Sequence, residues 1–84
     1  MKYYTYVLKS LNNEDIYVGS TENFNRRLSM HNQGKVKSTK AYRPWVLLEY
    51  QEYNSRSEAF RQEKFLKTGQ QKELLRKKYG GIAK

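Results

Sequence analysis

The chain has 84 residues, no cysteine and a formal net charge of +9, from 17 Lys and Arg against 8 Asp and Glu. This length predicts one domain over residues 1–84, with a single modest core over about residues 3–79. The lack of cysteine excludes disulfides and thiolate metal sites, and no apolar run approaches the ~20 residues that span a bilayer. No basic-then-apolar leader opens the sequence, so we expect a cytoplasmic protein without a membrane partner.

The positive charge is unevenly distributed along the chain. Between Asn23 and Leu48 there is no acidic residue, whereas six cations fall there: Arg26, Arg27, Lys35, Lys37, Lys40 and Arg43. Charge of one sign at this density attracts polyanions, and nucleic acid is the first candidate. A ribosomal or architectural protein would also be basic, and a merely solubilising surface would mix both signs. The charge therefore predicts the class of partner but not the activity.

The first predicted element is a hairpin of two strands, Tyr3–Ser10 and Asp15–Ser20, because β-branched and aromatic residues dominate both runs. A two-residue Asn-Asn turn between them would place Tyr6 opposite Gly19 and on the same face as Tyr17. Since Gly19 has no side chain, we expect a hole opposite Tyr6, with Tyr17 diagonal to it. Two phenols beside a hole form a candidate site.

A helix is predicted next, with Thr21 as its N-cap and Gly34 as its stop. One face of it carries residues at spacings of three and four: Phe24, Arg27, Leu28 and His31. Since Arg27 and His31 are four residues apart, their side chains project from the same face.

A basic loop, Lys35–Arg43, follows this helix. Lys and Arg neutralise phosphates, and an interleaved Tyr can stack on a base. The residues expected to bind substrate are therefore the cations of this region: Arg26, Lys35, Lys37, Lys40 and Arg43. The alternative is an ordinary solvated connector.

A third strand, Trp45–Tyr50, begins after Pro44 and is apolar on both faces at its start, so it should be largely buried. Trp45 is most simply a core anchor.

Two further helices follow the third strand. Ser55-Arg56-Ser57-Glu58 matches a capping box, and Gly69 is the expected stop of the helix that it opens. The last helix, Gln71–Tyr79, should bury Leu74 and Leu75 and end at Gly80-Gly81. The order β-β-α-β-α-α predicts an α+β fold with one three-stranded sheet and helices against it.

Glu63 interrupts the apolar stripe of the second helix. It lies four residues after Ala59, three after Phe60 and three before Leu66, so it faces the same side as they do. An inward carboxylate is costly unless it has a cation or a donor. Two explanations stay open: a salt bridge to an Arg at the edge of the core, or a metal ligand.

Five polar residues break the apolar pattern: Tyr6, Tyr17, Arg27, His31 and Glu63. One His and no Cys argue against a Ser-His-Asp triad and against zinc. An Arg, a phenol, an imidazole and a carboxylate suit phosphodiester hydrolysis, which needs an activated water and a cation at the transition state. Glu63 would hold one Mg²⁺ or Mn²⁺ that keeps most of its waters. Arg27 would clamp the phosphate, and a Tyr would accept the water proton once its pKa near ~10 is lowered.

These residues resemble the signature of the GIY-YIG nuclease family, which is named for two short tripeptides. Tyr4-Thr5-Tyr6 matches the first tripeptide only at its last Tyr, whereas Tyr17-Val18-Gly19 matches the second closely. The stretches from Tyr17 to Asn32 and from Glu63 to Gly69 are particularly like the small stand-alone bacterial members. The resemblance covers about Tyr3 to Leu75, which is nearly the whole chain.

The resemblance implies a three-stranded antiparallel sheet flanked by helices, and an endonuclease acting on DNA through one divalent metal, in repair or recombination. It implies that Glu63 ligates the metal, that Arg27 stabilises the transition state and that His31 assists the phosphate or the base. Tyr17, ranked ahead of Tyr6, would orient or deprotonate the water. Some branches carry a late Asn in the site, and this sequence has no counterpart after Glu63.

The leading hypothesis is a metal-dependent endonuclease in which Gly19 leaves space for the scissile phosphate. One alternative is a basic nucleic-acid-binding module on the same fold without efficient cleavage. Another is a scaffold whose basic face binds an acidic partner, which explains the charge but not Glu63. A chain this short has no room for a separate targeting domain, so we expect low affinity and selectivity for DNA, which a protein partner could supply. A monomer is the default expectation.

Overall fold

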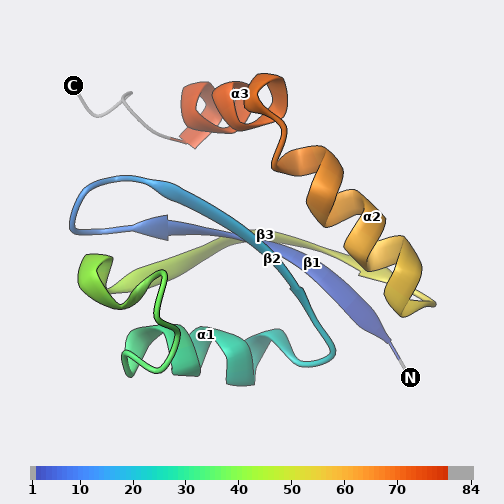
Figure 1. Ribbon diagram of the computed structural model, residues 1–84, viewed down its shortest axis with the longest axis horizontal. Helices are drawn as coiled ribbons and strands as arrows, with labels where there is room; N and C mark the ends of the chain where they lie inside the picture. The colour runs from blue at the N-terminus through green and yellow to red at the C-terminus, as the bar shows by residue number, and fades with distance from the viewer. Residues whose placement is uncertain (1, 80–84) are drawn as a thin grey trace.

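The computed structural model describes residues 2–79 as a three-stranded antiparallel sheet with helices on both faces (Figure 1). The strands lie in the order β2-β1-β3, so β1 is central. The elements in chain order are β1 (Tyr3–Ser10), β2 (Ile16–Thr21), α1 (Phe24–Asn32), the short 3₁₀ helix η1 (Lys40–Tyr42), β3 (Trp45–Tyr53), α2 (Arg56–Leu66) and α3 (Gly69–Tyr79). The predicted α+β class and the order β-β-α-β-α-α are confirmed. Within residues 2–79, the helices are too short or too polar to span a membrane.

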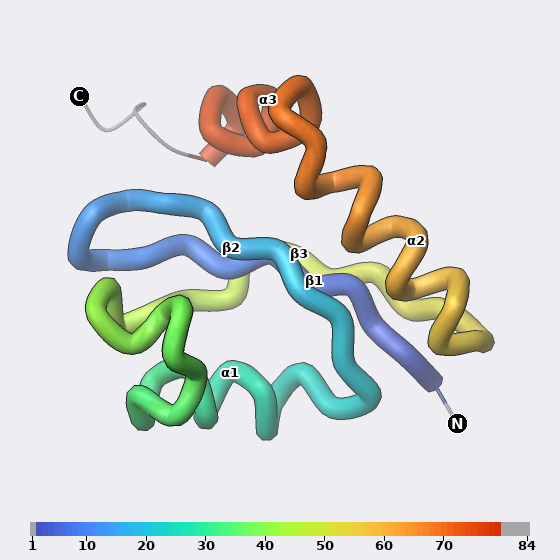
Figure 2. The backbone as a smooth tube through the Cα atoms, viewed as in Figure 1, coloured from blue at the N-terminus to red at the C-terminus, as the bar shows by residue number. Residues whose placement is uncertain are grey.

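The helices divide between the two faces of the sheet. In Figure 2, α1 lies along one side, while α2 and α3 lie along the other. The face toward α1 buries Tyr6, Leu8 and Trp45, with Leu28 of α1 packed against them. The opposite face buries four apolar residues: Val7, Ile16, Val18 and Leu75. The alternation of side chains along β1 therefore separates two core layers, and Trp45 is the core anchor that its position predicted.

The register of the hairpin agrees with the prediction, but its turn does not. Tyr6 pairs with Gly19 and Leu8 with Tyr17. The reversal uses residues 11–15 instead of two Asn residues alone, because the Ser10 hydroxyl accepts hydrogen bonds from the N–H groups of Asn12 and Asn13, at 3.0 and 3.1 Å. These bonds satisfy the loop amides without a tight turn.

Two helix boundaries also differ from the prediction. Asn23, not Thr21, is the N-cap of α1, and its side chain accepts a hydrogen bond from the N–H of Arg26 at 3.0 Å. Thr21 instead continues β2, where it pairs with Tyr4. Gly69 begins α3 and does not end α2, because α2 already stops at Leu66. The predicted Ser55 cap is confirmed, since its hydroxyl accepts from the N–H of Glu58 at 3.2 Å.

The buried stripes of α2 and α3 are narrower than predicted. Ala59 lies so close to the sheet that the Thr5 hydroxyl donates to its carbonyl at 2.8 Å. Phe60, the next residue along the helix, points away from this contact and is exposed. Along α3, Leu75 is buried and Leu74 is exposed.

The strand β3 extends beyond the predicted Tyr50 because it stays paired with β1 along its whole length. The Gly80-Gly81 stop lies outside the described residues.

Candidate active site

The predicted site residues meet around the edge strand β2. Tyr6 of β1 and Tyr17 of β2 lie on the face that α1 covers, and the ring centroid of His31 lies 6.0 and 4.9 Å from theirs. Glu63 comes from α2, on the other face, and reaches Ser20 of β2. Since β2 has a neighbour on one side only, groups from both faces can approach each other around its free edge.

A hydrogen-bonded chain fixes His31 in the core beneath this edge. Its Nε2 lies 3.1 Å from the Tyr6 hydroxyl, and its Nδ1 lies 2.8 Å from the Thr39 hydroxyl. We assign the His31 proton to Nδ1, because the Thr39 hydroxyl lies 3.3 Å from the carbonyl of Val36 and can donate its single proton there. In this tautomer Nε2 accepts the proton of Tyr6.

Burial and the charge of Arg27 together keep His31 neutral. His31 is fully buried, and desolvation, with a smaller repulsion from Arg27, lowers its pKa from 6.5 to about 4. A neutral imidazole can accept the Tyr6 proton, whereas an imidazolium has no lone pair to do so.

The lowered pKa of His31 predicts that acid destabilises the fold. Between pH 6.5 and about 4, His31 binds a proton in the unfolded chain but not in the folded chain. The free energy of unfolding therefore falls as the pH falls through this window. Urea unfolding should show a loss of about 2 kcal/mol between pH 7 and pH 5. In His31→Gln, which cannot titrate, the loss should shrink to below about 0.5 kcal/mol. An equal loss in both proteins would contradict the assignment.

Tyr6 and Tyr17 occupy different environments. Tyr6 is 1 % exposed, and burial raises its pKa to about 12, an effect that the neighbouring Arg27 only partly offsets. This is opposite to the lowering that a general base would need. Tyr17 is only partly buried, and its ring meets the edge of His31 at an interplanar angle of 63°. Tyr17 is therefore the phenol that water can reach, while Tyr6 links Arg27 to His31.

The expected hole opposite Gly19 does not exist. A Cβ built on Gly19 would lie 2.5 Å from the hydroxyl oxygen of Tyr6 and 2.6 Å from its Cζ. The ring of Tyr6 therefore fills the space that we had assigned to a scissile phosphate. Gly19 serves the site indirectly, because it lets the Tyr6 ring lie flat over the backbone of β2.

Arg27 presents a guanidinium to a pocket beside β2. Its Nε is buried and, among the described residues, has no hydrogen-bond partner. The pocket has a volume of about 580 Å³, and its lining includes Ser20, Arg26, Arg27 and Arg56. Hydrogen bonding to Tyr6, offset in part by desolvation, raises the pKa of Arg27, so the group stays charged and can attract an anion into the pocket.

Glu63 is held by two donors. The Ser20 hydroxyl donates to Oε1 at 2.5 Å, and Lys67 Nζ lies 2.7 Å from Oε2. Of the two explanations for Glu63, the ion pair is present, although the partner is Lys67, the C-cap of α2, and not an Arg. Glu63 is a single, nearly buried carboxylate, 13 % exposed, and no group of three or more His, Asp or Glu gathers within residues 2–79. Glu63 does not line the pocket itself, but its partner Ser20 does, and a single carboxylate there fits a Mg²⁺ that keeps most of its waters.

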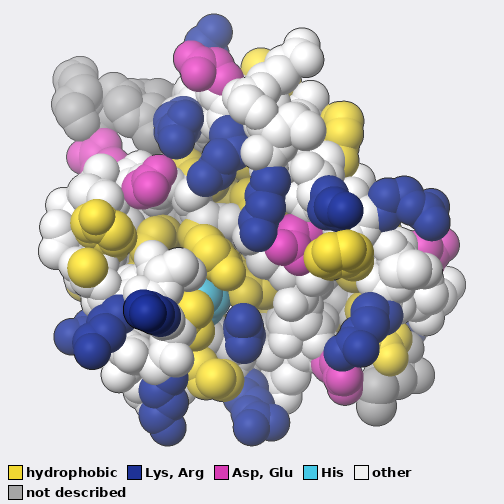
Figure 3. Space-filling view, in the orientation of Figure 1, with side chains coloured by type: hydrophobic (Ala, Val, Ile, Leu, Met, Phe, Trp, Pro, Cys, Tyr) yellow, Lys and Arg dark blue, Asp and Glu magenta, His cyan; other side chains and the backbone are white. Residues whose placement is uncertain are grey.

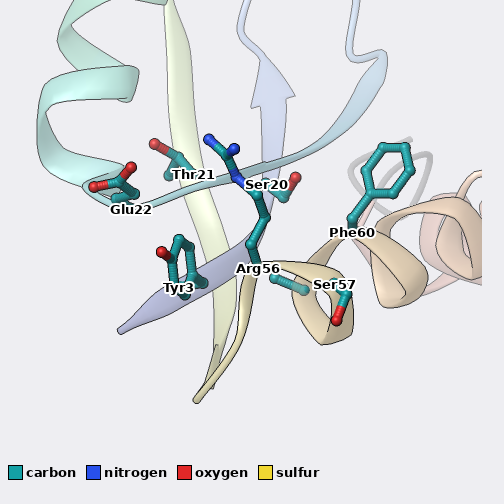
Figure 4. Close-up of a pocket in the computed structure, with 8 residues that line it drawn as sticks. Tyr3, Ser20, Thr21, Glu22, Arg56, Ser57 and Phe60 are labelled. Atoms are coloured by element: carbon teal, nitrogen blue, oxygen red, sulfur yellow. The ribbon is translucent and has the colours of Figure 1, made fainter. Parts of the chain in front are cut away.

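A second pocket adjoins the first and shares with it Arg56, a cation that the sequence analysis missed. It has a volume of about 600 Å³ and lies between the start of α2 and the end of β2. Figure 4 shows the Arg56 guanidinium directed toward Ser20 and Thr21, with Phe60 on the far wall. In the sequence, Arg56 lies inside the Ser55–Glu58 capping box, so its side chain was not assigned to a binding site.

The basic loop forms a separate site. Lys37, Lys40 and Arg43 line a pocket of about 420 Å³ together with Asn12. Gly34 adopts φ +79°, and a Cβ there would overlap the Arg43 guanidinium. Lys35 is exposed and not among the residues that line this pocket.

Cationic side chains are spread between hydrophobic ones on the face shown in Figure 3, and only a small part of the single His (cyan) is visible among them.

Comparison with known proteins agrees with this fold. A model of the GIY-YIG catalytic domain matches residues 2–79. A UPF0213 protein of Staphylococcus haemolyticus is 40% identical over 76 residues, which cover 89% of this chain and 92% of the relative. One from Streptococcus agalactiae is 42% identical over 65 residues, covering 76% and 73%. The solution NMR structure of a UPF0213 protein from Bacillus halodurans is 31% identical, with a TM-score of 0.55, and covers 99% of this chain and 90% of that one.

Proposed function

This chain belongs to the GIY-YIG family, a nuclease family, and we propose that it is a metal-dependent endonuclease that hydrolyses phosphodiester bonds in DNA. One observation supports the proposal: Ser20 of the edge strand donates a hydrogen bond to Glu63 and also lines an open pocket together with Arg27, so both groups lie near the same strand edge. We further propose that it acts in the cytoplasm, in DNA repair or recombination.

Each group around the edge has a role in this reaction. Arg27 binds the scissile phosphate with its planar fork and neutralises the charge that grows in the transition state. Glu63 would hold one Mg²⁺ or Mn²⁺, which supplies a Lewis acid and a more acidic water when bound. Ser20 keeps one carboxylate oxygen in place through its hydrogen bond, and the other oxygen is the one that Lys67 contacts.

Tyr17 is the phenol that we assign to the attacking water. It is partly open to solvent, and its ring lies against His31. Tyr6 is assigned to positioning, because its hydroxyl donates to His31 Nε2 and its ring is buried. His31 thus acts through Tyr6, which keeps the Arg27 guanidinium in place.

The DNA would be bound by cations on both sides of the cleavage site. Arg26 and Arg56 line the pocket with Arg27, while Lys37, Lys40 and Arg43 form the pocket of the basic loop. We assign Lys35 to the same surface. Contacts with phosphates carry no sequence information, so selectivity would come from DNA structure or from a protein partner.

A second candidate is a DNA-binding module that does not cleave. The ion pair between Lys67 and Glu63 at 2.7 Å favours it, because a carboxylate that is permanently neutralised cannot ligate a cation.

Metal removal separates the two candidates. Incubated with supercoiled plasmid, the protein should convert it to nicked circles in Mg²⁺ or Mn²⁺ and should leave it intact in EDTA. A non-cleaving module would shift the plasmid in a gel under both conditions and nick it under neither. Nicking that persists in EDTA would contradict the role given to the metal.

A further inference from the structure

Lys67 is placed to contact two residues of the active site at once. Its ammonium nitrogen lies 2.7 Å from Glu63 Oε2 and 5.7 Å from the centroid of the Tyr17 ring. Lys67 is the C-cap of α2, one residue beyond the helix, so its side chain turns back along α2 toward the edge of β2. This position joins the carboxylate on one face of the sheet to the phenol on the other.

The two donors to Glu63 differ in how easily they can leave. Ser20 is fixed in β2, is neutral and can keep its bond to Oε1 while Oε2 binds a cation. Lys67 has a 45 % exposed side chain and carries the same sign of charge as a metal ion. Each carboxylate oxygen keeps a second lone pair, so the hydrogen bond from neutral Ser20 does not oppose a divalent cation, whereas the Lys67 ammonium, 2.7 Å from Oε2, repels one.

We propose that Lys67 competes with the divalent cation for Glu63. Lys67 therefore acts through Glu63, as a positioning residue, and sets the affinity of the site for its metal ion. Without metal, Lys67 neutralises Glu63. With metal, it leaves Oε2 and remains on the π face of Tyr17, where a cation is attracted by the ring. This inference rests on the proposed function, since it assumes that Glu63 is the metal ligand.

Titration with Mn²⁺ in the absence of DNA tests the competition directly. Free Mn²⁺ is measured by electron paramagnetic resonance against the full-length chain at constant ionic strength. Lys67→Met, which keeps the length of the side chain without its charge, should bind Mn²⁺ about tenfold more tightly than wild type. Lys67→Arg keeps the charge and should stay within about threefold of wild type.

Lys64→Met is the matched control, because it removes one charge from α2 at a position where the ammonium lies over Phe60 at 5.2 Å instead of near Glu63. It should change the affinity less than about twofold. A thermal melt with Mn²⁺ gives a second readout: the cation should raise the Tm of Lys67→Met by more than that of wild type.

Two outcomes would overturn the inference in different ways. If Lys67→Met and wild type bind Mn²⁺ equally, while Glu63→Gln weakens both, the competition is wrong and the metal role of Glu63 stands. If Glu63→Gln changes Mn²⁺ binding in neither background, the metal role itself fails and the inference falls with it.

Discussion

Replacing Arg27 with Ala is expected to lower the rate constant of DNA cleavage by about a thousandfold, while DNA binding weakens by less than about tenfold. The reason is that Arg27 lines the pocket beside β2, so its charge lies where negative charge is expected to grow in the transition state, while Arg26 and Arg56 remain to bind DNA. Loss of an interaction that strengthens in the transition state lowers the rate constant more than it weakens binding.

The measurement is single-turnover nicking of plasmid at saturating protein, with binding followed separately by fluorescence anisotropy. Arg26→Ala removes a neighbouring cation of the same pocket and should weaken binding while leaving the saturated rate constant within about threefold. Arg61→Ala, exposed on α2 and outside the lining of both pockets beside β2, should match wild type in both assays. If Arg27→Ala cleaves within tenfold of wild type, Arg27 does not stabilise the transition state.

Gly19→Ala is expected to lower the free energy of unfolding by about 3 kcal/mol and to abolish most of the nicking activity. The new methyl group would lie 2.5 Å from the Tyr6 hydroxyl oxygen, and the Tyr6 ring is enclosed by the core. The ring therefore has to move, and that movement breaks its hydrogen bond to His31 at 3.1 Å. Overpacking and the loss of a buried hydrogen bond then add together.

Urea unfolding of Gly19→Ala beside Gly69→Ala tests this explanation. A Cβ on Gly69 meets no atom within 4 Å, and the residue opens a helix, so that substitution should be neutral or should stabilise by up to about 1 kcal/mol. A Gly19→Ala protein as stable as wild type would mean that the Tyr6 ring is not confined.

The sequence predicts those parts of the site that depend on local periodicity. Strand alternation places Tyr6 opposite Gly19 with Tyr17 on the same face, and the structure has this register. Helical spacing puts Arg27 and His31 on one face of α1, and His31 is buried there as the single His of the chain. A carboxylate in an apolar stripe identifies Glu63 as unusual. In each case the pattern lies within one element or one hairpin.

The parts that the sequence does not predict depend on how distant elements meet. Ser20 reaches Glu63 only because α2 crosses the sheet at the free edge of β2, and the two residues are 43 positions apart. Thr39 binds His31 from a loop that has no regular period. The prediction of a hole at Gly19 is wrong for a similar reason. No sequence pattern shows which rotamer Tyr6 adopts, and in the structure its ring fills the space next to Gly19.

The ion pair of Lys67 with Glu63 shows the limit most clearly. Both residues belong to the stretch that resembles the GIY-YIG family, and four positions separate them, which is a common spacing for solvent-exposed pairs. Only the structure shows that this pair reaches the ring of Tyr17, and thereby connects the metal ligand to the phenol assigned to the water.

The most direct measurement of the central claim compares wild type with Glu63→Gln in the nicking of supercoiled DNA at saturating Mn²⁺. Gln keeps the shape of the side chain and the acceptor for Ser20, but it removes the charge that holds a cation. Wild type should nick the plasmid, and Glu63→Gln should be slower by at least about a thousandfold while binding DNA normally. Equal nicking by the two proteins would contradict a metal-dependent nuclease centred on Glu63.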